Sequence, residues 1–214
     1  MRTAERLSIM YDRLLSEFGP QHWWPADSAL EVAVGAILTQ NTSWSNVERA
    51  IANLKTAGLM SLEALSSLPT GLLAEYIRPS GYYNVKAGRL HNLLALINEH
   101  HNGSLDDFLD QPLPLLRTEL LSVKGIGRET ADTILLYAAH LPIFVVDAYT
   151  HRILVRHEVV DPEYDYESIQ ELFMDHLPND PALFNEYHAL LVCAGKKYCK
   201  KSKPDCSACP LEGV

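Results

Sequence analysis

Apolar residues recur at helical spacing along most of this chain. Leu30, Val34 and Ile37 stand four and three residues apart, which places them on one face of a helix. The same spacing returns in three later segments, at residues 47–54, 90–97 and 134–138. Strand-like patterns are nearly absent, apart from a short β-like run at residues 143–146. With prolines and glycines separating the segments, the pattern predicts an all-α fold of about ten helices joined by short loops.

Two closely spaced glycines, Gly125 and Gly127, precede the last of these apolar segments. Glycine permits a sharp turn and lets a ligand approach the backbone closely. The N–H groups that begin the following helix then favour a phosphate. Because Gly-x-Gly is also common in helix–helix turns that bind nothing, the hairpin taken alone has a purely structural alternative.

A single carboxylate, Asp147, follows the β-like run directly. Aspartate at such a junction most often caps the next helix, here one that starts at Ala148. A phosphate-binding turn followed by a single carboxylate nevertheless indicates chemistry on DNA more than chemistry on a small metabolite. The order of the two features therefore favours a function over two unrelated structural details.

These segments resemble the helix-hairpin-helix DNA glycosylases, the superfamily of endonuclease III and the adenine mismatch glycosylase. The family's hairpin is matched by Leu121-Ser-Val-Lys-Gly-Ile-Gly127, and its catalytic Val-Asp-x-x-x-x-Arg motif by residues 146–152, which end at Arg152. The resemblance covers nearly the whole chain. Within the superfamily, three segments are most similar to the 3-methyladenine DNA glycosylase III branch: Trp23-Trp-Pro25, Leu38-Thr-Gln-Asn-Thr42 and Pro79-Ser-Gly-Tyr-Tyr-Asn84.

The resemblance implies two helical domains with a DNA-binding cleft between them. A six-helix barrel would span about residues 27–138, with the helix-hairpin-helix motif at about 118–137. The second domain would combine residues 1–26 with residues 139–214 and would end in a cysteine-rich loop.

The resemblance also assigns roles to individual residues. Asp147 would be catalytic, stabilising the sugar cation and orienting water, while Trp23 and Trp24 would stack on a base turned out of the duplex. Gln40 and Asn41 would fill the gap that the base leaves. The other proposed DNA contacts are Lys124, Gly125, Gly127 and Arg128. Two structural alternatives stay open: a core wedge for the tryptophans, and a helix-ending turn for residues 40–42.

The residue at position 129 bears on the reaction type. Members of the family that also cut the strand carry a lysine there, which forms a Schiff base, and this chain has Glu129. A carboxylate cannot replace an amine nucleophile. Lys124, before the hairpin, is a poor substitute, so the sequence predicts a monofunctional enzyme that leaves an abasic site.

All four cysteines lie near the C-terminus: Cys193, Cys199, Cys206 and Cys209. Such a cluster indicates a metal or iron–sulfur site more than disulfides. The last three match the first three cluster positions of endonuclease III, whose fourth ligand would fall one residue past Val214. Cys193 stands upstream instead, as either the fourth ligand or a buried core thiol. We expect a [4Fe–4S] cluster with a structural role, over a zinc site or no metal.

Charge modifies the picture only locally. The chain is ordinary in composition, 47% hydrophobic and 21% charged, with a net charge of −9. From Cys193 onward the sequence has five lysines and two acidic residues, Asp205 and Glu212, which gives this segment a net charge of +3. The rest of the chain therefore carries a net charge of −12. A basic loop on an acidic body can bind DNA locally while limiting nonspecific binding.

No apolar run reaches membrane length and no signal peptide is apparent, so we expect a cytoplasmic, nucleoid-associated monomer. Its partner would be double-stranded DNA with a damaged base. The expected function is base excision repair of alkylated purines such as 3-methyladenine. The alternatives are a mismatch or oxidised-base glycosylase, with or without strand cutting, and a noncatalytic DNA-binding module.

Overall fold

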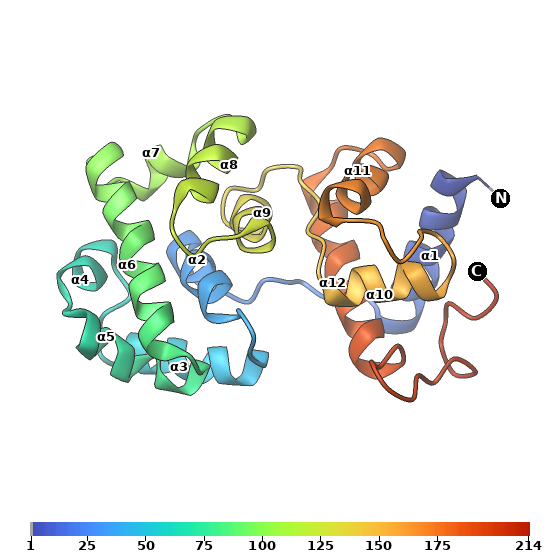
Figure 1. Cartoon of the computed structure of the whole chain (residues 1–214), viewed down its shortest axis with the longest axis horizontal. Coiled ribbons are helices and arrows are strands. Elements are labelled where there is room, and N and C mark those ends of the chain that lie inside the picture. Colours follow the sequence, from blue (N-terminus) through green and yellow to red (C-terminus); the bar gives the residue numbers. More distant parts are fainter. Residues whose placement is uncertain (1) are drawn as a thin grey trace. The chain divides into compact units, whose positions relative to one another are not determined.

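The computed structural model describes residues 2–214, and over these residues it contains twelve α-helices, one 3₁₀ helix and no strand (Figure 1). The all-α fold class is therefore confirmed. The elements are α1 Thr3–Phe18, α2 Ala29–Leu38, α3 Trp44–Thr56, α4 Leu62–Ser67, α5 Thr70–Tyr76, η1 Arg78–Ser80, α6 Tyr83–His100, α7 Leu105–Leu109, α8 Leu113–Ser122, α9 Arg128–Tyr137, α10 Ala148–Arg156, α11 Tyr166–His176 and α12 Pro181–Lys197.

The structure has more helices than the apolar pattern predicts. The additional ones include α4 and α7, of six and five residues, which are too short to show a 3.6-residue period. Each begins at a serine, Ser61 or Ser104, whose side chain accepts a hydrogen bond from a backbone N–H in the first turn. Local capping, and not amphipathic spacing, marks these two elements.

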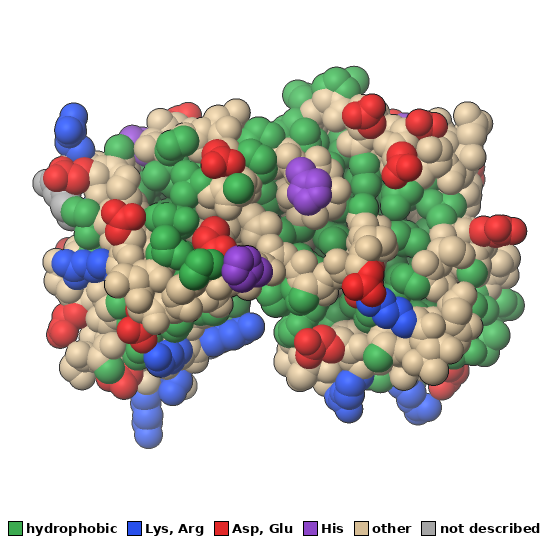
Figure 2. Space-filling model, turned by 180° about the vertical axis from the view of Figure 1, so that it is seen from behind, with side chains coloured by type: hydrophobic (Ala, Val, Ile, Leu, Met, Phe, Trp, Pro, Cys, Tyr) green, Lys and Arg blue, Asp and Glu red, His purple; other side chains and the backbone are tan. Residues whose placement is uncertain are grey.

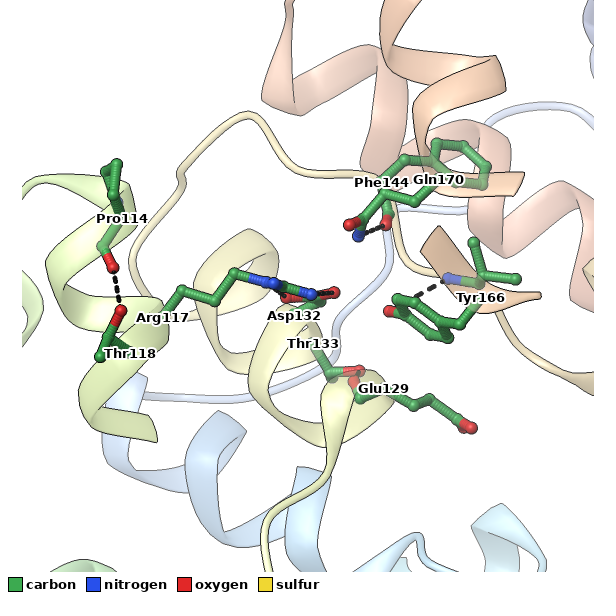
Figure 3. A network of polar contacts seen from close by, with 10 residues as sticks. Pro114, Arg117, Thr118, Glu129, Asp132, Thr133, Phe144, Tyr166 and Gln170 are labelled. Atoms are coloured by element: carbon green, nitrogen blue, oxygen red, sulfur yellow. Dashed lines mark hydrogen bonds and ion pairs between the residues drawn. The ribbon is translucent and has the colours of Figure 1, made fainter. Parts of the chain in front are cut away.

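The β-like run at residues 143–146 is buried but is not a strand. Side chains of α11 satisfy its backbone in place of a neighbouring strand. Gln170 donates from Nε2 to the Phe144 carbonyl at 2.6 Å, and the Val146 N–H points to the Tyr166 hydroxyl at 3.5 Å (Figure 3). The prediction of β-like structure there was wrong because an apolar run only reports burial.

The chain divides into two compact units. Residues up to Pro25 together with His140–Val214 form the terminal unit, and Ala26–Ala139 form the central unit. No helix in the described part of the chain is long and apolar enough to cross a bilayer.

In the central unit, α2 is buried along nearly its whole length, because its residues are almost all apolar. It packs against α3, α6 and α9. Lys86 of α6, only 1% exposed, donates from Nζ to the carbonyl oxygens of Leu38 at 2.8 Å and Ser80 at 2.7 Å. Burial, assisted by the charge of Arg89, lowers the pKa of Lys86 to about 8. This amine therefore ties the end of α2 to the end of η1.

The terminal unit has an aromatic core. Phe144 stacks on Phe173 with ring centroids 3.7 Å apart, and Tyr187 of α12 meets both rings edge-on. The Tyr187 hydroxyl donates to the Leu7 carbonyl at 2.9 Å, which fastens α12 to α1. The apolar residues before Asp147 are thus anchored by burial on α11 and α12.

Candidate functional site

The predicted hairpin is present between α8 and α9 in the central unit. Val123 and Ile126 are buried, whereas Lys124, Gly125 and Gly127 are exposed. Arg128 and Glu129 are also exposed, in the first turn of α9. The apolar pair anchors the turn, and the residues predicted to contact DNA lie on the outside.

The two hairpin glycines differ in what they require. Gly125 has a φ of +99°, and a Cβ placed there would lie 2.4 Å from Cγ of Arg89. Gly127 has a φ of −98°, and a Cβ there would meet nothing within 4 Å. Gly125 is therefore needed by the fold itself, whereas the fold tolerates a side chain at position 127.

A buried ion pair holds the two helices of the hairpin together. Arg117 of α8 donates from Nε and Nη2 to both carboxylate oxygens of Asp132 of α9, at 2.7 and 3.1 Å (Figure 3). Asp132 is fully buried. Removing one partner of such a pair costs about 3–5 kcal/mol, so the pair fixes the hairpin geometry.

Gln40 lies against the hairpin. Its Nε2 donates to the Gly125 carbonyl at 3.2 Å and to the Thr130 hydroxyl at 2.9 Å, and its Oε1 accepts from Arg89. These contacts give Gln40 a structural use in addition to the predicted base-binding role. Asn41, the next residue, is exposed and has a left-handed φ of +54°.

Tyr82 is a candidate contact residue that the sequence reasoning did not single out. It is 73% exposed and has a φ of +48°, unusual for a bulky residue. Lys86 donates hydrogen bonds to the carbonyls of both Leu38 and Ser80. The turn with Asn41 follows Leu38, and Tyr82 follows Ser80, so both turns begin close to the Lys86 amine. Exposed strained residues concentrate at functional sites. Sequence spacing could not reveal this exposure.

Asp147 is the N-cap of α10 in the terminal unit. Its Oδ1 accepts from the Thr150 N–H at 2.7 Å and from the Thr150 hydroxyl at 3.0 Å. Burial opposes ionisation, but the contact with His188 and the two bonds from Thr150 outweigh it and lower the pKa of Asp147. The carboxylate is therefore ionised at neutral pH, and the structural alternative, a helix cap, is compatible with a catalytic role.

The second oxygen of Asp147 faces a residue that the sequence did not suggest. His188 of α12 places Nε2 3.7 Å from Oδ2 of Asp147, and the two side chains are 10% and 13% exposed. Nothing in the local sequence links residues that are so far apart along the chain.

Trp23 and Trp24 follow α1 in the terminal unit. Their rings lie 5.2 Å apart at 55°, and both residues are half-buried. The segment is fastened to α12 through Gln21, whose N–H donates to Glu186 at 2.7 Å and whose Oε1 accepts from the Cys193 thiol at 3.1 Å. One helix, α12, thus anchors the tryptophan segment and carries the histidine that faces Asp147.

The four cysteines do not form one group. Burial raises the pKa of the Cys209 thiol, with a smaller contribution from the charges of Cys199 and Cys206. Cys193 bonds to Gln21, and burial raises its pKa without a contribution from another cysteine. Over residues 2–214, no three histidine, cysteine or acidic side chains converge closely enough to hold a metal ion.

Two arginines brace the cysteine loop on α10. Arg152, the arginine of the Asp147 motif, donates from Nε to the Cys199 carbonyl at 2.8 Å. Arg156 donates to the Cys199 sulfur at 3.2 Å and to the carbonyls of Lys200 and Lys201. The start of the cysteine loop is therefore held to α10 mainly through the backbone of residues 199–201.

Basic side chains do not form a continuous surface on the face shown in Figure 2, where acidic and basic groups are interspersed with apolar ones. Of the five lysines in the C-terminal region, Lys197 is paired with Glu17 at 2.8 Å. Lys196, Lys200, Lys201 and Lys203 are exposed. The basic charge is local, as the sequence predicts.

Comparison with known families gives one clear match. Residues 34–179 match the sequence model of the HhH-GPD superfamily base excision DNA repair proteins. A proposed DNA repair glycosylase of Methanocaldococcus jannaschii is 47% identical over 210 residues, which cover 97% of this chain and 94% of that protein. Endonuclease III of Escherichia coli is 26% identical over 100% of this chain and 96% of its own length.

Solved structures agree with this match. The 3-methyladenine DNA glycosylase MagIII of H. pylori, bound to 1,N6-ethenoadenine, has a TM-score of 0.76 and 31% identity, over 90% of this chain and 96% of that one. Endonuclease III in a noncovalent DNA complex has a TM-score of 0.84 and 22% identity, over 99% and 94%. The latter likeness shows that the fold is that of endonuclease III.

Proposed function

Because the chain belongs to the HhH-GPD superfamily of base excision DNA repair proteins, we propose that this DNA repair glycosylase removes alkylated purines such as 3-methyladenine. The reaction is hydrolysis of the N-glycosidic bond, without strand cutting, and it leaves an abasic site in double-stranded DNA.

The observation that carries the proposal is the state of Asp147. Its Oδ1 is held by Thr150, and its lowered pKa keeps the group ionised. An anionic carboxylate stabilises the positive charge that develops on the sugar as the base departs. Because an alkylated purine leaves as a neutral base, it needs little help from a general acid, and one carboxylate suffices.

The absence of strand cutting follows from Glu129. The position that would carry the amine nucleophile holds a carboxylate in the first turn of α9, and its side chain is drawn in Figure 3. A carboxylate cannot form a Schiff base with the sugar aldehyde. Lys124, the nearest lysine in sequence, lies on the other side of the hairpin glycines.

The choice of an alkylated purine rests on Trp23 and Trp24. Indole rings attract cations by about 1–2 kcal/mol when desolvated, and an alkylated adenine is a cationic ring. The half-buried pair is anchored in the same unit as Asp147. The likeness to the H. pylori 3-methyladenine DNA glycosylase supports the same substrate class.

DNA would be held by the central unit. The exposed hairpin residues Lys124, Gly125, Gly127 and Arg128 would bind phosphates, with Asn41 and Tyr82 nearby in contact with bases. Since phosphate contacts position the duplex without reading it, substrate choice would come from the tryptophans.

The cysteine loop would hold an iron–sulfur cluster with a structural role. Cys199, Cys206 and Cys209 are the candidate thiolate donors, because they lie in one C-terminal segment whose first sulfur accepts a hydrogen bond from Arg156. Cys193 does not fit as the fourth, because its thiol is bonded to Gln21, so the fourth iron would need a ligand other than a cysteine of residues 1–214. Binding would have to draw the three thiolates together, as metal sites often do when they fold.

Iron analysis of anaerobically purified protein tests this assignment. We expect a yellow-brown protein with about four irons per chain. Cys209→Ser should lose the colour, whereas Cys193→Ser should keep it. Stoichiometric zinc, a colourless folded protein, or loss of iron in the Cys193 variant would overturn the assignment.

A substrate panel tests the function as a whole. Duplexes carrying 3-methyladenine, a mismatch, an oxidised pyrimidine or uracil should show preferred release of 3-methyladenine, and borohydride should trap no covalent adduct. A trapped adduct would indicate a strand-cutting enzyme, with Lys124 the first candidate nucleophile. Preferred release of a mismatched or oxidised base would favour that class, and binding without release would indicate a noncatalytic module.

A further inference from the structure

Asp147 has two oxygens in different surroundings. Oδ1 accepts two hydrogen bonds from Thr150, at 2.7 and 3.0 Å, and is committed to the helix cap. Oδ2 lies outside the cap and faces Nε2 of His188 at 3.7 Å. This distance is longer than a hydrogen bond, a separation that often shortens when substrate binds.

The elements that carry the two residues approach closely. Gly195 of α12 lies against Tyr149 of α10, and a Cβ on this glycine would come within 2.2 Å of the Tyr149 ring. The close contact between α10 and α12 therefore requires glycine at position 195. Asp147 caps α10 and His188 lies on α12, so the packing of these two helices brings the two side chains together.

Other ionisable groups near Asp147 are turned elsewhere. On α10, His151 faces the Pro162 carbonyl at 3.3 Å, and Arg152 and Arg156 reach the cysteine loop. On α12, Glu186 accepts from the Gln21 N–H, and on α11 the Tyr166 hydroxyl faces the Val146 N–H. His188 is the ionisable side chain in ion-pair contact with this carboxylate among those described.

We propose that His188 is a positioning residue for Asp147, holding Oδ2 so that the carboxylate stays ionised and turned toward the reacting sugar. The inference rests on the proposed catalytic role of Asp147. With Oδ1 fixed by Thr150, a contact at Oδ2 fixes the plane of the carboxylate. A carboxylate fixed on both sides needs no reorientation as positive charge develops on the sugar.

The test compares His188→Phe, which removes the donor, with His188→Gln, which can place a donor nitrogen close to the position of Nε2. Single-turnover base release would be measured on whichever duplex of the panel the wild-type enzyme cleaves. Binding would be measured on a duplex with an uncleavable analogue, and folding by thermal unfolding. His101→Phe is the matched control, since His101 pairs with Glu119 at 2.8 Å in the central unit.

We expect His188→Phe to slow base release by about 10- to 100-fold, the cost of losing one bond to a charged group. Duplex affinity should stay unchanged, and His188→Gln should recover most of the rate. Adding His188→Phe to Asp147→Asn should slow release no further. The control should lose stability but keep wild-type release.

A second measurement does not depend on turnover. The carboxyl carbon of Asp147, followed by NMR, should titrate at higher pH in His188→Phe than in the wild type. Wild-type release by His188→Phe, or an unchanged titration, would overturn the positioning role. If Asp147→Asn itself retains wild-type release, the catalytic assignment of Asp147 fails instead, and the two failures are thereby distinguished.

Discussion

The helices α9 and α10 begin in opposite ways. At α9 the N-cap is Gly127, which has no side chain to satisfy the first N–H groups. At α10 the N-cap is Asp147, whose carboxylate bonds to the N–H of Thr150. The first N–H groups of α9 thus receive no acceptor from the N-cap side chain, whereas those of α10 bond to a carboxylate that the protein supplies itself.

In the proposed function, this difference separates DNA binding by the central unit from catalysis by the terminal unit. In the proposed function, the hairpin of the central unit binds phosphates, so a change there should weaken binding to every duplex alike. The proposed catalytic and base-binding residues of the terminal unit are side chains held by other side chains, so a change there should affect turnover or substrate choice.

Asp147→Asn should lower base release by about 1,000-fold or more, because the anionic charge that stabilises the sugar cation is lost. Asparagine caps helices as well as aspartate does, so the protein should remain folded. Single-turnover kinetics measure the loss of base release, and duplex binding checks that the variant remains folded. Wild-type release in this variant would reduce Asp147 to a structural cap.

Trp24→Ala should lower release of the alkylated base by about 1–3 kcal/mol of transition-state stabilisation, the contribution of one stacked base. Trp24→Phe should restore part of it. Rates on alkylated and mismatched duplexes, measured side by side, check the prediction. If the pair only packs, the alanine variants of Trp23 and Trp24 will lose thermal stability while the ratio of the two substrates stays constant.

The hairpin glycines should respond differently to the same change. Gly125→Ala should destabilise the protein by about 1–3 kcal/mol, because its φ of +99° strains any side chain and Arg89 occupies the space. Gly127→Ala should leave folding intact and weaken binding to every duplex by about tenfold, as a side chain keeps the phosphate away. Thermal unfolding and duplex titrations distinguish the two. A change in substrate preference at Gly127 would contradict the separation of DNA binding from catalysis.

The local features of both sites could be predicted from the sequence. Gly125, Gly127 and Asp147 lie in short motifs, in which neighbouring residues determine the turn and the cap. The all-α class followed from the helical spacing of apolar residues. The residues that determine these features are close together in the sequence, so the sequence pattern alone was enough to predict them.

Features that depend on distant segments could not be predicted. His188 stands 41 positions after Asp147, and only the packing of α12 on α10 brings them together. The bonds of Gln40 to Gly125 and Thr130, and the exposure of Tyr82, likewise result from tertiary packing. The spacing of the cysteines could not decide whether Cys193 is a cluster ligand or a core thiol, since its partner Gln21 lies near the other end of the chain.

The smallest expected effect is on the pH dependence of stability. The pKa of Asp147 is lowered in the folded protein, so its charged form favours folding. That contribution is present above the unfolded value, near 3.9 for aspartate, and is lost as pH falls through the folded value. The free energy of unfolding of the wild type minus that of Asp147→Asn should therefore be constant at neutral pH and decrease in acid, as the contacts of His188 and Thr150 with the ionised carboxylate are lost. Denaturant unfolding at a series of pH values measures this difference. A difference that grows in acid would mean that burial dominates and that the carboxyl group is held neutral, which would remove the distinction between the start of α10 and the uncapped start of α9.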